Sequence, residues 1–258
     1  MLSNLHRLPS LRKGGDGAGG LPIILLALAP VFIPTTYAAC VLYRCAKRTS
    51  ATTRIESSSS SSDIALPPAV SAAAQGQYVI SRERIESEVV VVPIPGTLQQ
   101  EDEEEDRLIE RYLSTTMRMF TYTPQAYIMK SMVSRLTVAD TFSPEYLSAC
   151  RFEPGDRVCG VYVVRERIGS RRVILDLSPP EGWNGPVVSG VLDCGFVVVE
   201  KDRKGGRFFN ETVMWRRLDE KPTLLEGAVG RVLHGLMVRW MVVRGVEAVL
   251  GGGKAKTS

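Results

Sequence analysis

The sequence predicts an α+β domain in which a long C-terminal helix packs across an antiparallel sheet, preceded by a single transmembrane helix. An uncharged apolar run at residues 21–43 predicts the span, strand-like pairs beyond residue 155 predict the sheet, and helical periodicity near the C-terminus predicts the long helix. The expected organisation is a basic N-terminal tail (1–20), the transmembrane helix (21–43), a flexible linker (44–76), the α+β domain (77–250) and a flexible tail (251–258).

The predicted span reads LPIILLALAPVFIPTTYAACVLY, which meets the roughly 20 residues needed to cross a bilayer. Pro22, Pro30 and Pro34 each remove a backbone donor, which kinked membrane helices tolerate. A cleaved signal peptide is the alternative, since basic residues precede the run and alanines occupy 38–39. The run is longer than the roughly 7 to 15 residues of a signal core and ends at basic Arg44, Lys47 and Arg48, as the flank of a membrane span would, so we expect a single-pass anchor.

Charge indicates where the domain lies. The net charge is +4, and much of the basic excess sits beside the apolar run, which predicts a lipid bilayer as partner and no nucleic acid. Basic residues on both sides leave the orientation nearly balanced, leaning toward a cytosolic domain. The first residues carry no acid before Asp16, so a mitochondrial membrane is a second location. Five cysteines without CxxC spacing predict free thiols and no metal site.

Residues 44–76 contain a serine run at 57–62, two prolines and an alanine-rich stretch, a composition typical of a flexible linker. β-Branched clusters at 78–94 predict one or two strands. The acidic block at 101–106, followed by apolar residues at helical spacing, predicts a helix over 102–121. Thr123 before Pro124 starts a second helix, and Ser143 before Pro144 starts a short third one.

Two hairpins should follow these helices. Strands are expected at 158–164 and 172–177, joined through Gly169, and at 187–200 and 207–218, joined by KDRKGG. A capping box of Thr223 and Glu226 opens the final helix, which is expected to reach about residue 250. Charged residues along that helix exclude a second membrane span. Its predicted buried face comprises Leu225, Val229, Val232, Leu233, Leu236, Met237 and Trp240.

This order of elements resembles the helix-grip arrangement of the START-like (SRPBCC) superfamily. The strings FEPGDRVCGVYVVRER (152–167), FFNETVMWRR (208–217) and GRVLHGLMVRWMV (230–242) are similar to a poorly characterised START-like family of unknown function, over about residues 120–250. The four strands predicted after the helices are fewer than usual in the superfamily, and the anchor lies outside its usual domain. The resemblance implies a hydrophobic small molecule held between sheet and long helix. A fully packed core without a cavity is the alternative.

Candidate acid/base residues are few. The chain has no GxGxxG after a strand and no P-loop, HExxH or GxSxG motif, so no cofactor is predicted. Strand alternation places Glu211 on one face with apolar neighbours, where burial would raise its pKa. The alternative for Glu211 is an ion pair with Arg165 or Arg217. His234 is the one histidine of the domain, and it falls off the apolar stripe, which predicts a position on the surface or against a loop.

The predicted function is a membrane-anchored binding domain for a hydrophobic small molecule or lipid. A cyclase or isomerase acting on a hydrophobic biosynthetic intermediate, with Glu211 or His234 as acid/base, is one alternative. A structural membrane-associated protein without ligand is the other. The predicted ligand-binding residues are Tyr162, Trp183, Glu211 and Trp215.

Overall fold

The computed structural model describes residues 36–56, 66–67, 70, 77–90, 98–133, 137–183, 185, 187–199 and 205–251. The chain divides into two compact units, residues 1–41 and 42–258, and the packing below is that of the second. A helix occupies residues 36–48. The elements that follow are β1 (Ser50–Glu56), β2 (Tyr78–Val90), α3 (Leu98–Phe120), α4 (Pro124–Val133), the 3-10 helix η1 (Ala139–Phe142), α5 (Pro144–Ala149), β3 (Arg157–Val158), β4 (Tyr162–Ile168), β5 (Arg172–Leu177), β6 (Ser189–Val199), β7 (Gly205–Arg217) and α6 (Ala228–Gly251).

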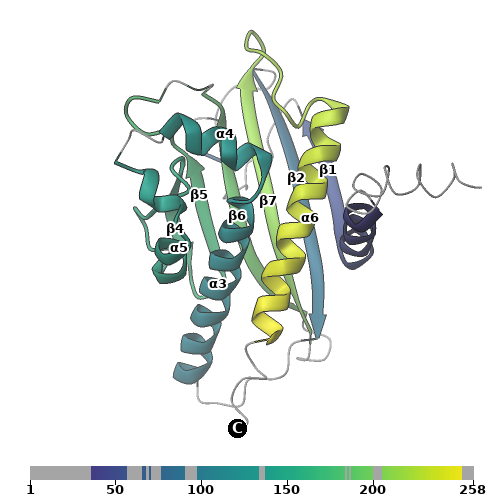
Figure 1. Ribbon diagram of the computed structural model, residues 1–258, viewed down its shortest axis with the longest axis vertical. Helices are drawn as coiled ribbons and strands as arrows, with labels where there is room; N and C mark the ends of the chain where they lie inside the picture. The colour runs from purple at the N-terminus through teal and green to yellow at the C-terminus, as the bar shows by residue number, and fades with distance from the viewer. Residues whose placement is uncertain are drawn as a thin grey trace, which may run out of the picture. The chain divides into compact units, whose positions relative to one another are not determined.

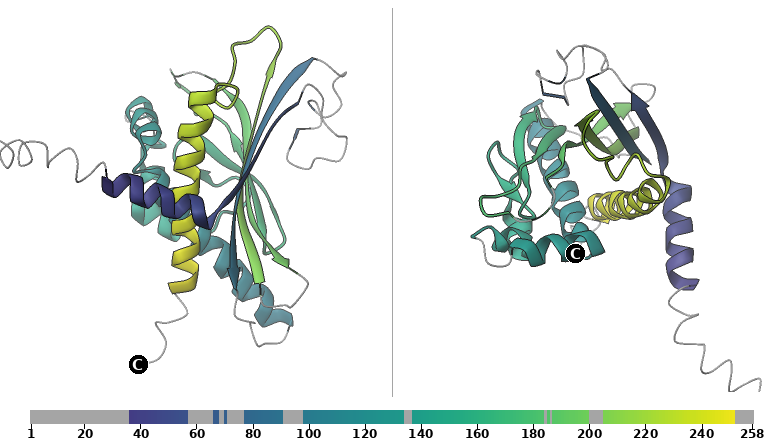
Figure 2. Two further views of the ribbon diagram at one scale, coloured as in Figure 1. Left: turned by 90° about the vertical axis from the view of Figure 1, so that its right-hand side faces the viewer. Right: turned by 90° about the horizontal axis from the view of Figure 1, so that it is seen from above.

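The strands form one antiparallel seven-stranded sheet in the order β1-β2-β7-β6-β5-β4-β3. β2, which precedes the helices, pairs along its whole length with β7, the last strand. Helices α3 and α6 lie side by side on one face of the sheet (Figures 1 and 2). The predicted α+β class, the antiparallel sheet and the C-terminal helix packed on it are confirmed.

Side-chain alternation gives the sheet an inner face, which contacts α3 and α6, and an opposite outer face. On the inner face Ile85 and Phe208 pack with Tyr112 of α3 and Val242 of α6 in one continuous core. The Tyr112 hydroxyl donates a 2.7 Å hydrogen bond to Oδ1 of Asn210, which satisfies a buried amide. A second cluster covers the outer face and comprises Leu66, Val70, Ile80, Ile174, Val191 and Val213.

Two glycines let α6 approach its neighbours closely. A Cβ atom at Gly245 would lie 2.7 Å from both Thr116 Oγ1 and Tyr112 Cδ2 of α3. A Cβ atom at Gly235 would lie 2.9 Å from Glu83 Oε1 of β2. Because these distances are shorter than those of ordinary Cβ contacts, glycine at 245 lets α6 lie close to α3, and glycine at 235 lets it lie close to β2.

The predicted buried face of the final helix is confirmed only in part. Leu225, just before α6, is buried, and Met237 and Trp240 are partly buried against the core. Val229, Val232 and Leu233 of the predicted face are 74%, 61% and 62% exposed. The buried residues are instead Gly235, Val238, Met241, Val242, Val243, Gly245 and Val246. The helix is apolar on several sides, so close contact through its glycines decides which side packs.

β1 corrects the predicted linker over 44–76. Residues 50–56 pair with β2 from Ser50↔Glu86 to Glu56↔Ile80, so the folded unit begins well before residue 77. Thr52, Thr53 and Ile55 are β-branched residues, which suit a strand once the edge of β2 offers backbone partners. Within residues 57–76 of the predicted linker, only 66, 67 and 70 belong to the described residues.

The predicted span at 21–43 lies largely outside the described residues, which begin at 36. Residues 36–43 are helical, and most of them are exposed. Within the described part of the chain, no helix has the length and apolar character that crossing a bilayer requires. The anchor stays a prediction, and the tails at 1–20 and 252–258 also lie outside the described ranges.

The helix starts at 124 and 144 are confirmed, because Thr123 Oγ1 accepts from Ala126 N–H and Ser143 Oγ accepts from Tyr146 N–H. The strand predicted at 158–164 is divided into β3 and β4. Cys159 and Gly160 have positive φ angles of 47° and 74°, which turn the chain between the two strands. Among the described residues, five strands therefore follow helices α3 to α5, one more than the four predicted.

Candidate functional site

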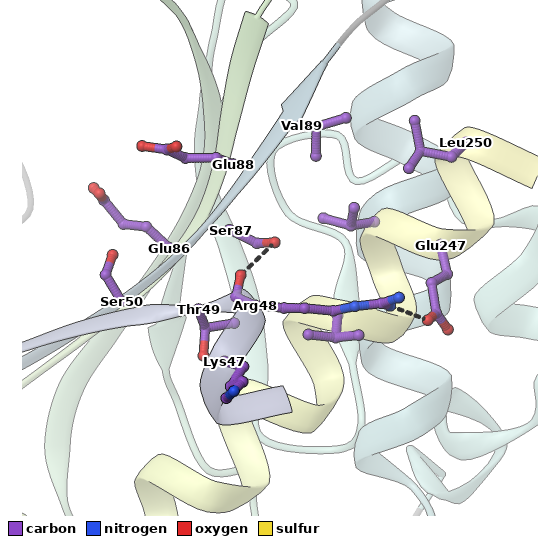
Figure 3. Close-up of a pocket in the computed structure, with 12 residues that line it drawn as sticks. Lys47, Arg48, Thr49, Ser50, Glu86, Ser87, Glu88, Val89, Glu247 and Leu250 are labelled. Atoms are coloured by element: carbon purple, nitrogen blue, oxygen red, sulfur yellow. Dashed lines mark hydrogen bonds and ion pairs between the residues drawn. The ribbon is translucent and has the colours of Figure 1, made fainter. Parts of the chain in front are cut away.

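A groove of about 820 Å³ lies beside α6, where this helix passes β2 and the chain that enters β1 (Figure 3). Four segments contribute to it: the end of the helix at 36–48, the start of β1, the last residues of β2 and the C-terminal turns of α6. The lining residues are Lys47, Arg48, Thr49, Ser50, Glu86, Ser87, Glu88, Val89, Val243, Val246, Glu247 and Leu250.

The floor of the groove is apolar. Val89 comes from the inner face of β2, and Val243 and Val246 come from α6; each is 6–8% exposed. Leu250 continues the same helix surface and is 48% exposed. A floor of this kind favours hydrocarbon, since burying each methylene group contributes roughly 0.8 kcal/mol.

The rim of the groove is charged. Arg48 reaches along α6 to Glu247, with 2.7 Å between Nη1 and Oε1 (Figure 3). Arg244 pairs with the other oxygen of the same carboxylate at 3.0 Å. Arg48 and Glu247 are 61% and 41% exposed, so water screens this pair and it contributes at most about 1 kcal/mol.

Hydrogen bonds fix the corner at residues 46–50 to α6 and β2. Arg239 of α6 donates through Nη1 to the Thr49 carbonyl at 3.1 Å and to the Ala46 carbonyl at 3.4 Å. This arginine therefore caps the C-terminal end of the helix at 36–48, where carbonyls lack helical partners. Ser87 Oγ of β2 donates to the Arg48 carbonyl at 3.1 Å. The backbone that carries Lys47 and Arg48 is thus held by two different elements.

Glu86 and Glu88 border the groove but direct their carboxylates away from α6 (Figure 3). Glu86 binds Arg84 at 2.6 Å, and both glutamates bind Arg207, at 3.1 and 2.9 Å. Their negative charge is compensated at the outer face of the sheet. Glu247 is therefore the carboxylate that faces the apolar floor among the described lining residues.

Glu211 forms an ion pair, with partners other than the two predicted. It lies opposite Arg84 in the β2–β7 register, and Arg84 Nη1 is 3.0 Å from its carboxylate. Arg82 lies 3.6 Å away. Sequence could not identify these partners, because β2 and β7 are neighbours only in the folded sheet.

The predicted ligand-binding residues do not come together. Tyr162 lies on the inner side, edge-on to Phe120 with 5.8 Å between ring centroids, and burial raises the pKa of Tyr162. Trp183 packs against the same core. Trp215 packs in the outer cluster, on the face that carries Glu211. The four residues thus lie on opposite faces of the sheet, and none of them lines the groove.

His234 is not on the surface or against a loop, as predicted, but faces β2. Its Nδ1 pairs with Oε2 of Glu83, and the two side chains are 10% and 5% exposed. The neighbouring Gly235 lies directly over the same carboxylate, so the bare glycine surface makes room for this pair. Sequence reasoning missed Glu83, although a glycine next to a histidine on a long helix was a usable signal of close packing.

Within the described ranges, no three His, Cys, Asp or Glu side chains gather as ligands of one metal ion. Comparison of the chain with protein-family models, with curated proteins and with solved structures gave no match. The site is therefore interpreted from its own chemistry.

Proposed function

We propose that the protein is a membrane-anchored binding domain of the START-like, helix-grip type, which holds a hydrophobic small molecule or lipid in the groove beside α6. The observation that carries this proposal is the groove itself, with an apolar floor, a basic rim and a wall that begins just after the predicted membrane span.

The strand order supports the START-like part of the proposal. A strand that precedes the helices pairs with the last strand, and a long C-terminal helix crosses the sheet beside that pair. This order is compatible with a helix-grip fold, to which β1 adds an edge strand. The site proposed here is displaced from the one that the resemblance implies, because the described side chains between α6 and the sheet form a continuous core.

The position of the groove in the chain supports a lipid-like ligand. The predicted span ends at Tyr43, and the groove wall begins four residues later at Lys47, within one continuous helix. At ~1.5 Å per residue this is a path of roughly 6 Å. A span through residues 21–43 would therefore bring the groove near the lipid head groups of a single-pass membrane, with the domain on the cytosolic side or in a mitochondrial membrane.

The test is photolabelling of the full chain in lipid nanodiscs with an alkyl-diazirine fatty acid, followed by mapping of the labelled residues. Label is expected at 86–89 and 243–250. Leu250→Asp should reduce this labelling several-fold, because a charge enters the apolar floor. Leu233→Asp is the matched control, since Leu233 is 62% exposed on the same helix and does not line the groove. Label confined to other segments, or lost equally in both variants, would refute the proposed site.

An enzyme acting on a hydrophobic intermediate is the second candidate, and a separate observation favours it. His234 and Glu83 form a buried imidazole–carboxylate pair, an arrangement that can act as a general acid or base. Incubation of the protein with hydrophobic molecules extracted from it, followed by mass analysis, tests for a product. Glu83→Gln should stop product formation, whereas Glu211→Gln should leave it unchanged. If no product forms and the groove peptides are not labelled, the remaining hypothesis is a structural membrane-associated protein that binds no ligand.

A further inference from the structure

Two arginines converge on the carboxylate of Glu247: Arg48, which lines the groove, and Arg244, which lies three residues earlier on α6, outside the lining. Arg48 binds one oxygen of Glu247 at 2.7 Å, and Arg244 binds the other at 3.0 Å. A guanidinium group recognises carboxylate and phosphate oxygens in the same way. The two arginines therefore form an anion site, which Glu247 fills in the protein itself.

This internal anion is exchangeable. Arg48, Arg244 and Glu247 have side chains that are 61%, 47% and 41% exposed, so each can remain solvated while the pair opens. Exposed ion pairs contribute only about 0.2 to 1 kcal/mol. Arg239, by contrast, is committed to the backbone at residues 46 and 49 and stays in place.

The apolar floor continues directly from this anion site. Val243, Val246 and Leu250 stand three or four positions from one another along α6 and on either side of Glu247, so they share its helix surface. Glu86 and Glu88 are held by arginines on the outer face and do not oppose an anion here. A charged head at Arg48 and Arg244 would thus lie beside a hydrocarbon chain on the valines.

We propose that the groove selects an anionic amphiphile, with a carboxylate or phosphate head and an alkyl chain, and that Glu247 competes with this head for Arg48 and Arg244. This inference rests on the proposed function and names its ligand class. Glu247 occupies the anion site when no ligand is bound, and its competition sets the affinity for the ligand. Its removal strengthens binding, and loss of Arg48 weakens it.

The experiment compares an alkyl-diazirine carboxylate with the alcohol of the same chain length, using the full chain in phosphatidylcholine nanodiscs. Glu247→Gln should raise groove labelling by the carboxylate about two- to five-fold, as expected for loss of an exposed ion pair, and leave the alcohol unchanged. Arg48→Gln should lower carboxylate labelling by a similar factor. Asp219→Asn, which removes an exposed carboxylate from outside the groove, is the control and should change neither.

The outcomes separate two failures. Equal labelling by carboxylate and alcohol, with no response to Glu247→Gln, would overturn head-group selection while leaving the groove as a hydrophobic site. No labelling of the groove by either probe would refute the proposed function as well. Excess inorganic phosphate provides a further arm: competition as potent as that of a long-chain alkyl phosphate would overturn an amphiphile in favour of a free anion, and much weaker competition supports the amphiphile.

Discussion

Replacing Gly245 with alanine tests how α6 is seated on α3. The added Cβ would lie 2.7 Å from Tyr112 Cδ2 and 2.8 Å from Cε2 of the same ring, and 2.7 Å from Thr116 Oγ1. Neither side chain has room to yield. Tyr112 and Thr116 are 0% and 1% exposed, and the Tyr112 hydroxyl is engaged with Asn210.

The expected loss of stability is about 2 kcal/mol. Over-packing a core costs about 1–3 kcal/mol. If the Tyr112 ring moves to relieve the clash, its hydrogen bond lengthens and a buried amide loses part of its partner, at a cost of about 1–3 kcal/mol when complete. Alanine is better than glycine in a helix by roughly 1 kcal/mol, which offsets part of this loss.

Urea unfolding of the full chain in detergent, followed by tryptophan fluorescence, measures the effect. Trp240 lies on the same helix and reports on its detachment. Gly251→Ala is the matched control, because Gly251 ends α6 and has no atom within 4 Å of an added Cβ. The control should stay within about 0.5 kcal/mol of the wild type. If the Gly245→Ala protein is as stable as the wild type, or more stable because alanine favours the helix, α3 and α6 are not in close contact at position 245.

Three further outcomes are expected. The hydrogen bond from Arg216 lowers the pKa of Glu226, so this ion pair stabilises the protein fully above the ordinary pKa of 4.5 and is lost as the pH falls below it. Glu226→Gln should therefore reduce the loss of stability in acid. Parallel curves of stability against pH for the two proteins would contradict the ion pair. Gly235→Ala should destabilise the protein much less when Glu83 is already alanine, with a coupling free energy of about 0.5–3 kcal/mol in a double-mutant cycle. Additive effects would show that the two residues are not in contact. Among the thiols outside the predicted span, iodoacetamide should modify half-buried Cys150 before buried Cys45, Cys159 and Cys194, and comparable rates at all four by mass mapping would contradict this burial. Burial raises the pKa of all four, that of Cys150 to about 11.

Local signals predicted much of this fold. The starts of α4 and α5 could be read from Thr123 and Ser143, because a cap involves only residues within one turn. The hairpin of β6 and β7 followed from strand alternation around a polar turn. β1 was not predicted, since residues 50–56 become a strand through pairing with β2, and their three β-branched residues are a weak signal beside the serine run that follows.

The candidate site depended on contacts across the sequence. Lys47 and Arg48 were interpreted as the flank of a membrane span, and their place at the groove follows from Arg239, which lies far along the chain. Val243, Val246 and Leu250 carried a usable signal in their spacing around Glu247. This spacing did not stand out, because α6 is apolar on several sides and more than one of its faces could be the buried one.

The contact between Gly235 and Glu83 also constrains how this chain can evolve. A side chain at position 235 costs less stability once position 83 has shortened, and a histidine at 234 then loses its carboxylate. Among homologous sequences these three positions should therefore change together, with small residues at 83 accompanying alanine or serine at 235. An order of substitutions is favoured as well, because the intermediate that keeps Glu83 and adds a side chain at 235 carries the full cost of the close contact.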